Sequence, residues 1–529
     1  MDKMLLLGDE AIAQAAMDAG LSGVYAYPGT PSTEITEYIQ HSADSKKKQI
    51  HCRWSTNEKT AMEAALGMSF AGKRAMVCMK HVGLNVAADA FMNAAVTGVV
   101  GGLVVVSADD PSMHSSQNEQ DSRFFGQFAM IPILEPSNQQ EAYDMTYAAF
   151  EMSERLEIPV MLRITTRLAH SRSGIVRYQE KEQNEIRFST NLRQFVLLPA
   201  NARVQYQKLL DLQPVFVGES EKSAYNQFFP GKDNKYGIIA SGIAFNYLME
   251  NFPTGCEYPV LKIGQYPLPE SALQKMAESC DELVVIEEGY PLIEAYLLGL
   301  KGYGLKVLGR LSGFLPRSGE LNPDIVGAAF GLSMPKLNSI SEVIKNRPPS
   351  LCVGCGHRDL YDVLNMAVAE KGDTCKVFGD IGCYTLGYLP PFKAIHTCVD
   401  MGASITMAKG AADAGLEYAV AIIGDSTFTH SGMTSLLDAI NENSPITVII
   451  SDNETTGMTG GQDSAGTGKL EAICLGLGVH PDHLKVLVPL KKNHSEMLEV
   501  IKGEMEYRGT SVIIPRRECI QTLARKRKK

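Results

Sequence analysis

Short apolar runs alternate with segments of helical periodicity along most of the chain. The runs lie at residues 23–27, 75–79, 103–107, 159–163, 236–240 and 283–287. Between them, the spacing of apolar residues predicts helices that include 60–71, 87–96 and 244–251, and at the amino terminus a helix over 4–20. Short runs rich in β-branched residues indicate buried strands, and strands that alternate with helices indicate parallel sheets. The pattern therefore predicts a doubly wound α/β fold.

The clearest strand–helix–strand unit lies at residues 418–462. An apolar run ends at Gly424-Asp425-Ser426, a helix is predicted over 433–441, and a second apolar run ends at Asp452-Asn453. Such a unit is right-handed with parallel strands, so Asp425 and Asn453 are expected just past the carboxyl ends of adjacent strands, where α/β sheets bind ligands. Both offer hard oxygen atoms that suit Mg²⁺ beside a diphosphate. The alternative is that both are ordinary turn residues.

The length of the chain and one irregular stretch predict its domains. At 529 residues the chain is long enough for several hydrophobic cores of ordinary size. Residues 171–235 are polar and lack a clear period, which indicates a boundary in that region. We therefore expect three α/β domains, over residues 1–190, 191–335 (with a linker at its start) and 336–529.

Composition excludes several classes of function. The chain has 50 Lys and Arg against 60 Asp and Glu, a net charge of −10, which argues against a general nucleic-acid binder. The apolar run at the amino terminus is interrupted by Asp9 and Glu10, so it is not a signal peptide. No charge-free apolar stretch reaches the roughly 18 residues that a membrane span requires. We therefore expect a cytoplasmic protein.

The cysteines predict neither a disulfide framework nor an iron–sulfur cluster. Their number, 11, is odd, and they are widely scattered. Cys352 and Cys355 have ligand-like spacing, but no second CxxC completes a zinc site and no ferredoxin-type CxxCxxCxxxCP run is present. Cys375, Cys383 and Cys398 could approach this pair in space. A redox CxxC remains an alternative, and we expect no iron–sulfur cluster in this chain.

The spacing around Asp425 resembles the signature of thiamine diphosphate enzymes, Gly-Asp-Gly followed about 25 residues later by Asn-Asn. Here Gly-Asp-Ser is followed by residues 427–451 and then Asp-Asn. The resemblance implies that Asp425, Asn453 and the backbone carbonyl of Thr455 bind Mg²⁺. The stretch from Met401 resembles the MGxGxxxAxG helix start of the same enzymes, where backbone amides suit a diphosphate, although it could serve helix packing alone. Further implied cofactor contacts are Cys355, Gly356, His357, Gly382, Cys383, Met401, Gly402, Ser404, Gly424, Ser426, Gly457 and Met458.

Glu58 matches the catalytic glutamate of thiamine enzymes. In that family a glutamate precedes a helix glycine by nine residues, as Glu58 precedes Gly67 here. A buried carboxyl protonates the aminopyrimidine ring, and burial keeps its pKa suitable. Glu63 is the rival candidate, and a glutamate at a helix start can also serve the helix dipole alone.

Several stretches resemble 2-oxoacid:ferredoxin oxidoreductases. YPGTPSTE at 27–34 resembles the segment that opens these enzymes and implies that Thr30 lies against the substrate, although Thr30 could simply cap a helix. LCVGCGH at 351–357 resembles their CxGCGH motif, which lies beside the cofactor. MKHVGLN at 79–85 and HSSQNEQDSR at 114–123 resemble the large (alpha) subunit of indolepyruvate:ferredoxin oxidoreductases.

The same resemblance does not identify the residue that binds the substrate carboxylate. Pyruvate-specific relatives hold it with an arginine at the place of Asp109, so Arg123, His81 or a residue of a partner subunit would have to substitute. The aryl-type resemblance and the missing arginine together imply a preference for aromatic 2-oxoacids.

The resemblance implies pyrimidine-binding, transketolase C-terminal-like and diphosphate-binding domains, in that order. It also implies oxidative decarboxylation of an indolepyruvate- or phenylpyruvate-type 2-oxoacid to an acyl-coenzyme A, with electrons passed to ferredoxin. The expected partner is a smaller (beta) subunit, in a dimer of heterodimers, and the expected cofactors are thiamine diphosphate and Mg²⁺.

In one respect the chain departs from that family. The family's large subunit continues into a ferredoxin domain with two iron–sulfur clusters, whereas this sequence ends at Lys529. Either a cluster or flavin on a partner takes the electrons, or the reaction is a non-oxidative decarboxylation or carboligation.

Overall fold

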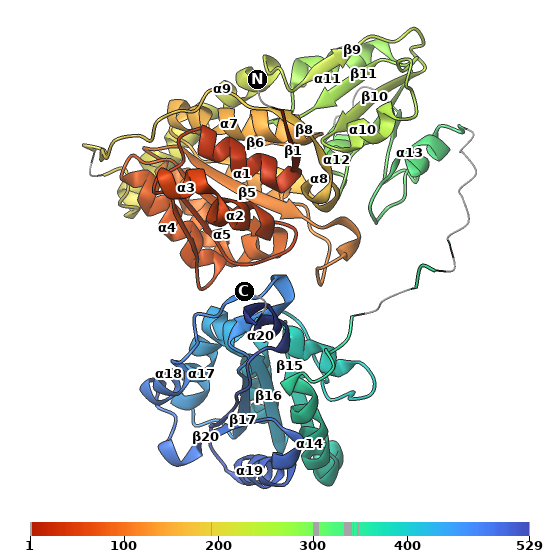
Figure 1. Cartoon of the computed structure of the whole chain (residues 1–529). Helices are drawn as coiled ribbons and strands as arrows, with labels where there is room; N and C mark the ends of the chain where they lie inside the picture. Colours follow the sequence, from red (N-terminus) through yellow and green to blue (C-terminus); the bar gives the residue numbers. More distant parts are fainter. Residues whose placement is uncertain are drawn as a thin grey trace. The chain divides into compact units, whose positions relative to one another are not determined.

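The computed structural model describes residues 3–191, 193–299, 306–332, 341, 343–345 and 349–527. The chain divides into two compact units, Met1–Asn338 and Ser339–Lys529 (Figure 1). Both units are α/β structures whose sheets are largely parallel, as the alternating pattern predicts. The expected boundary between residues 335 and 336 lies outside the described residues, and the three-domain division stays a prediction.

One sheet of the first unit has the strand order β12-β6-β7-β5-β4-β2-β3. Its neighbouring strands are parallel except at the edge, where β12 is antiparallel to β6. The strands are β2 (Gly23–Ala26), β3 (His51–Trp54), β4 (Ala75–Lys80), β5 (Leu103–Asp109), β6 (Ile133–Leu134), β7 (Val160–Thr165) and β12 (Gln265–Tyr266). The helices are α1 (Gly8–Asp18), α2 (Thr33–His41), α3 (Ala43–Lys47), α4 (Glu58–Phe70), α5 (His81–Thr97), α6 (Arg123–Ala129), α7 (Gln139–Leu156) and α8 (Thr166–His170).

Another sheet of the first unit has the order β14-β13-β10-β11-β9, parallel except for β9. Its strands are β9 (Gln227–Phe229), β10 (Tyr236–Ser241), β11 (Val260–Ile263), β13 (Glu282–Ile286) and β14 (Lys306–Leu308). The accompanying helices are α10 (Ala244–Met249), α11 (Glu270–Ser279), α12 (Leu292–Gly299) and α13 (Pro323–Ala329). Because β12 follows β11 in sequence but pairs with β6, it links the two sheets into one unit.

The second unit contains a parallel sheet of order β15-β16-β17-β21-β20. Its strands are β15 (Cys375–Gly379), β16 (Tyr418–Gly424), β17 (Ile446–Ser451), β20 (Leu484–Leu487) and β21 (Ser511–Pro515). Alternate residues of β16 pack on opposite faces, so Val420 lies in one core with α14 (Gly356–Lys371) and α19 (His494–Glu506). Ala421 lies in the other core with α15 (Ala403–Asp413), α17 (Met433–Asn441) and α18 (Leu470–Leu477).

Three expectations about local structure were wrong. Residues 4–7 belong to a strand, β1 (Lys3–Leu7), which pairs antiparallel with the distant β8 (Arg172–Val176), and α1 begins only at Gly8. The stretch 171–235 is not irregular, because it contains β8 and the long helix α9 (Pro199–Glu221). Helix α5 begins at His81, six residues earlier than the pattern predicts.

No helix in the described part of the chain combines the length and apolar character that a bilayer span requires.

Candidate active site

Asp425 lies at the carboxyl end of β16, one strand away from Asn453. Strands β16 and β17 pair in parallel with Gly424 opposite Ser451, so the residues that follow them meet at one edge of the sheet. Asp425 is 2% exposed, and its Oδ2 has no hydrogen-bond partner among the described residues. Burial, reinforced by Asp452, raises the pKa of Asp425 to about 7. A buried carboxylate without a counter-charge is suited to a cation.

The residues after β17 are held by backbone interactions. Asn453 Oδ1 accepts from the Thr455 amide at 3.2 Å, and the Asn453 carbonyl accepts from the Cys519 amide at 3.0 Å. Thr455 Oγ1 donates to the Gln462 carbonyl at 2.9 Å, which joins the short strands β18 (Thr455–Thr456) and β19 (Gln462–Asp463). These contacts fix the backbone around Thr455, the expected third Mg²⁺ ligand.

The start of α15 partly matches the expected diphosphate site. Gly402 has φ +93°, and a Cβ there would lie 2.5 Å from Ser431 Cβ, so only glycine fits before this helix. The Ser404 amide, which we expected to face a diphosphate, donates to Asp380 Oδ2 at 3.1 Å. Burial raises the pKa of Asp380 to about 6, and Tyr384 donates to the same carboxyl group. Ser404 Oγ has no partner among the described residues, so part of this helix start is capped within the chain and part is available to a ligand.

Five of the other predicted cofactor contacts, Cys355, Gly356, His357, Cys383 and Gly457, line a pocket of about 100 Å³ together with Asn453. His357 is buried, and its Nδ1 lies 2.7 Å from Ser451 Oγ. Burial lowers the pKa of His357 to about 4, so its ring is neutral at pH 7. Its Nε2 has no partner among the described residues. The pocket-lining residues include Cys352, Cys355, Gly356, His357, Cys383, Asn453, Gly457 and Cys519.

Four predicted cofactor contacts are not among the residues that line this pocket. Gly382 precedes the turn that begins at Cys383, and its amide donates to Thr385 Oγ1 at 3.0 Å. Met458 is 58% exposed in the turn Gly457–Thr459. Ser426 Oγ lies 2.9 Å from Thr456 Oγ1. Met401, immediately before Gly402, is partly buried.

Four cysteines line this pocket: Cys352, Cys355, Cys383 and Cys519. Burial raises the pKa of Cys383 to about 12, with Cys355, Cys519 and Cys352 contributing in the same direction. The sequence analysis did not single out Cys519, because it lies far along the chain and belongs to no motif. The sequence analysis considered Cys375, Cys383 and Cys398 as neighbours of the CxxC pair, and the pocket contains Cys383 and Cys519 instead. The expected absence of an iron–sulfur cluster stays a prediction.

In the first unit Glu58 is the first residue of α4 and is 5% exposed. A Cβ at Gly83 would lie 2.5 Å from Glu58 Oε1, so the carboxyl group packs directly on α5 where a side chain is absent. The rival Glu63 is half exposed and pairs with Lys59. The geometry thus favours Glu58 as the buried acid.

Thr30 lies beside a lysine that the sequence analysis passed over. Ser115 Oγ donates to the Thr30 carbonyl at 3.2 Å, and Lys80 Nζ donates to the Ser115 carbonyl at 2.8 Å. The Lys80 stem would lie 3.2 Å from a Cβ at Gly29. Burial lowers the pKa of Lys80, while Asp110 and Glu58 act in the opposite direction. Within the described residues Lys80 forms no ion pair, although it stands in the MKHVGLN stretch at the end of β4.

The other candidates for the substrate carboxylate are already occupied or buried. Arg123 is fully buried and pairs with Asp121 at 2.5 Å and with Glu287 at 2.9 Å. His81 is 1% exposed with its Nε2 3.2 Å from the Asn118 carbonyl, while its Nδ1 has no partner among the described residues. Asp109 pairs with Arg163 at 2.8 Å in the same interior. The two ends of the polar loop, at Asp109 and at Arg123, are therefore buried, and this placement argues against Arg123 as a substrate ligand.

Comparison with known proteins matches a thiamine-binding family in each of the two units. Residues 14–216 match the family described as "Pyruvate flavodoxin/ferredoxin oxidoreductase, thiamine diP-bdg". Residues 380–514 match "Thiamine pyrophosphate enzyme, C-terminal TPP binding domain", and this range contains Asp425 and Asn453. The indolepyruvate oxidoreductase subunit IorA of Methanothermobacter thermautotrophicus is 39% identical over 98% of this chain and 87% of its own length.

The chain belongs to the indolepyruvate oxidoreductase subunit IorA family. The family member of Archaeoglobus fulgidus is 36% identical over 100% of this chain and 88% of its own length. A solved 2-oxoglutarate:ferredoxin oxidoreductase from Magnetococcus marinus aligns with a TM-score of 0.49 at 16% identity, over 62% of this chain and 65% of that one. The IorA family assignment and the two thiamine domains make this chain a subunit of a thiamine diphosphate-dependent 2-oxoacid oxidoreductase that catalyses oxidative decarboxylation.

Proposed function

We propose that this subunit acts on an aromatic 2-oxoacid of the indolepyruvate or phenylpyruvate type. The printed names of the relatives at 36–39% identity support this substrate class. The 2-oxoacid anion and coenzyme A would give the acyl thioester, carbon dioxide, one proton and two electrons. Steady-state assays of indolepyruvate, phenylpyruvate and pyruvate test the assignment, and a higher kcat/KM for pyruvate would refute it.

The proposal for the binding site of Mg²⁺ and thiamine diphosphate rests on Asp425. Its buried, unpartnered oxygen lies at the strand edge next to Asn453, and two hard oxygen ligands suffice for Mg²⁺ when a diphosphate supplies more. Asp425, Asn453 and the Thr455 carbonyl would hold the ion. Calorimetry with thiamine diphosphate, with and without Mg²⁺, measures whether binding depends on the ion.

Glu58 would act on the cofactor's aminopyrimidine ring. Bound thiamine diphosphate supplies a nucleophilic carbon and an electron sink. Glu58 would hold the proton on the ring nitrogen, and its burial against Gly83 keeps water away from that hydrogen bond. Thr30 and the His81 ring would lie on the substrate side, as the sequence analysis expects.

Lys80 would hold the substrate carboxylate in place of the arginine of pyruvate-specific relatives. Its ammonium group lies one hydrogen bond from Ser115, which in turn contacts Thr30. A cation without an internal carboxylate partner is available to an anionic substrate. Lys80→Met should raise KM for the 2-oxoacid by roughly 10²-fold, whereas Lys80→Arg should retain most of the affinity. Equal KM values in wild type and Lys80→Met would exclude this role.

The four pocket cysteines would hold an iron–sulfur cluster that receives the two electrons one at a time. This proposal reverses our expectation from sequence. Cluster binding requires about four thiolates around one site. The proposal rests on the four thiols that line one pocket. Wild-type protein purified anaerobically should be brown, and Cys519→Ser should lose the iron. Colourless, iron-free wild type would instead support the expectation from sequence that this chain holds no iron–sulfur cluster.

A smaller subunit would complete the enzyme, in a dimer of heterodimers that passes electrons to ferredoxin. The relatives are named as subunits, which supports a partner. The chain co-expressed with such a subunit should reduce ferredoxin when given an arylpyruvate and coenzyme A. Release of aldehyde without ferredoxin reduction would favour the non-oxidative alternative.

A further inference from the structure

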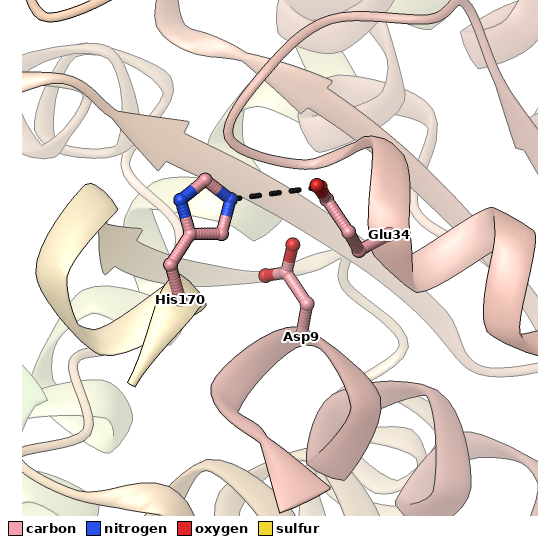
Figure 2. Close-up of side chains that lie close together, drawn as sticks. All are labelled: Asp9, Glu34 and His170. Atoms are coloured by element: carbon pink, nitrogen blue, oxygen red, sulfur yellow. Dashed lines mark ion pairs between the residues drawn. The ribbon is translucent and has the colours of Figure 1, made fainter. Parts of the chain in front are cut away.

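Three helix ends of the first unit bring two carboxylates and an imidazole together (Figure 2). Asp9 is the second residue of α1, Glu34 is the second residue of α2, and His170 is the last residue of α8. One ligand atom of each lies within 4.8 Å of the others. Figure 2 shows the Asp9 carboxylate directed toward the space between the other two side chains. None of these three residues is assigned above to the cofactor or to the substrate.

Asp9 is a buried acid to which the described residues offer no hydrogen bond, and the basic group of the cluster, His170, pairs with Glu34. Its exposed fraction is 0%, and both of its carboxylate oxygens lack a partner among the described residues. Burial, followed by the nearby Glu34 and then Glu10, raises the pKa of Asp9 well above its ordinary value. An ionised carboxylate in such a place is costly unless a proton or a cation neutralises it.

The spacing between Glu34 and His170 fits two ligands of one ion. Glu34 Oε2 lies 3.6 Å from His170 Nε2, which is too long for a normal hydrogen bond. Two metal bonds of about 2.1 Å that meet at a tetrahedral angle separate their ligand atoms by roughly 3.4 Å. Glu34 and His170 are about one-third exposed, which leaves an entry path for an ion and room for a water as a further ligand.

We propose that Asp9, Glu34 and His170 bind a divalent transition-metal ion of the Zn²⁺ type. Imidazole nitrogen and carboxylate oxygen are both ligand types that Zn²⁺ accepts, and a water would complete four-coordination. Imidazole nitrogen also distinguishes this site from the all-oxygen Mg²⁺ site at Asp425. Two carboxylates balance the charge of the ion, so the cost of burying Asp9 is offset.

The ion would hold the loop that contains Thr30 in a fixed position. Helix α2 begins two residues after Pro31, and Thr33 Oγ1 accepts from the Gly29 amide at 3.0 Å, so the start of α2 and the Thr30 loop form one turn. A metal bond to Glu34 would tie this turn to α1 and to α8, which follows β7. The ion would therefore have a structural role, with no part in the chemical step.

Zinc binding to the full-length chain tests the proposal. Chelator-stripped protein would be titrated with Zn²⁺ against a fluorescent zinc indicator, and its thermal midpoint measured with and without zinc. Wild type should bind about one equivalent and gain several degrees. Asp9→Asn and His170→Gln should each weaken binding on the order of 10²-fold or more. Asp44→Asn, an acid in the first turn of α3, and His41→Gln, at the end of α2, are matched controls that should bind zinc as wild type does.

The same titration separates this site from its rivals. Asp425→Asn should bind zinc normally, which shows that the ion is not in the cofactor site. In a Cys519→Ser background, which disables the thiol pocket, Co²⁺ should give a visible spectrum that Asp9→Asn in the same background lacks. Wild type that binds no zinc, or Asp9→Asn that binds it with unchanged affinity, would overturn the proposal. In that case Asp9 is a protonated buried acid, and Asp9→Asn should be at least as stable as wild type at pH 8.

Discussion

Deeply buried carboxylates of this chain differ in whether the chain itself supplies their counter-charge, as one example from each unit shows. In the first unit Asp121 and Glu287 pair with Arg123, and Asp109 pairs with Arg163, all with side chains almost inaccessible to solvent. In the second unit Asp425 is buried to a similar degree, but its Oδ2 has no partner among the described residues. An acid neutralised within the chain stabilises the fold, whereas an acid left without a partner indicates a site for a cation.

The contrast also appears within a single strand edge. Asp452 and Asp425 follow the neighbouring strands β17 and β16. Asp452 accepts from Arg516 Nε at 2.6 Å, whereas Asp425 faces no such cation. Asp9 resembles Asp425 in this respect, although it lies in the first unit. The predictions below test this contrast by changing buried acids, the arginine that neutralises some of them, or the pH.

The largest effect is expected from removing Asp425. Asp425→Ala should lose Mg²⁺-dependent cofactor binding and therefore at least about 10³-fold in turnover, because few other protein atoms can hold the ion. Asn453→Ala should act in the same direction. Turnover is measured with saturating thiamine diphosphate and Mg²⁺. Turnover within tenfold of wild type in both variants would show that Asp425 and Asn453 do not hold the ion.

Glu58→Gln should lower turnover on the order of 10²-fold while the cofactor still binds, since an acid–base group is lost without a change in shape. Glu63→Gln is the matched control on the same helix and should have wild-type turnover. If Glu63→Gln is the impaired variant instead, the catalytic role belongs to Glu63.

Arg123→Met should lower the free energy of unfolding by roughly 3–5 kcal/mol, because it leaves buried carboxylates without their partner. The KM for the 2-oxoacid should change little in protein that folds. Arg167→Met breaks an exposed pair with Glu320 and should cost about 0.2–1 kcal/mol. A rise in KM for Arg123→Met without loss of stability would instead assign Arg123 to the substrate.

The smallest effect is a dependence of Mg²⁺ affinity on pH. The raised pKa of Asp425, about 7, means that a proton competes with the ion below pH 7. Affinity should therefore fall up to about tenfold per pH unit as the pH decreases from 7 to 5, and stay level above pH 8. Titrations at several pH values measure this slope. Constant affinity between pH 5 and 8 would mean that Asp425 is ionised throughout.

The parts of the structure with strong local patterns could be predicted from sequence. Strands β16 and β17 and helix α17 have long apolar runs or a clear period, and their motif placed Asp425 beside Asn453. Strand β1 could not be predicted, because the residues that make it a strand lie in β8, far along the chain. Helix α9 contains Pro214, and its apolar residues show little helical period, which hides it in the sequence.

Long-range convergence explains the remaining differences at the site. Arg123 belongs to a polar stretch that resembles an exposed loop, and only the folded chain shows that carboxylates of distant strands surround it. Cys519 belongs to no motif, yet it joins Cys352 and Cys355 at one pocket. Lys80 was overlooked because its neighbour Thr30 lies on another strand end.

Calorimetric titration of thiamine diphosphate at pH 8 into wild type, Asp425→Asn and Asp452→Asn tests the central claim most directly. Wild type should bind the cofactor only with Mg²⁺, and Asp425→Asn should not bind it measurably. Asp452→Asn loses an internal ion pair, so it should be less stable but should bind within about tenfold of wild type. Normal binding by Asp425→Asn, or its loss in Asp452→Asn alone, would contradict the claim that the acid without a partner marks the cofactor site.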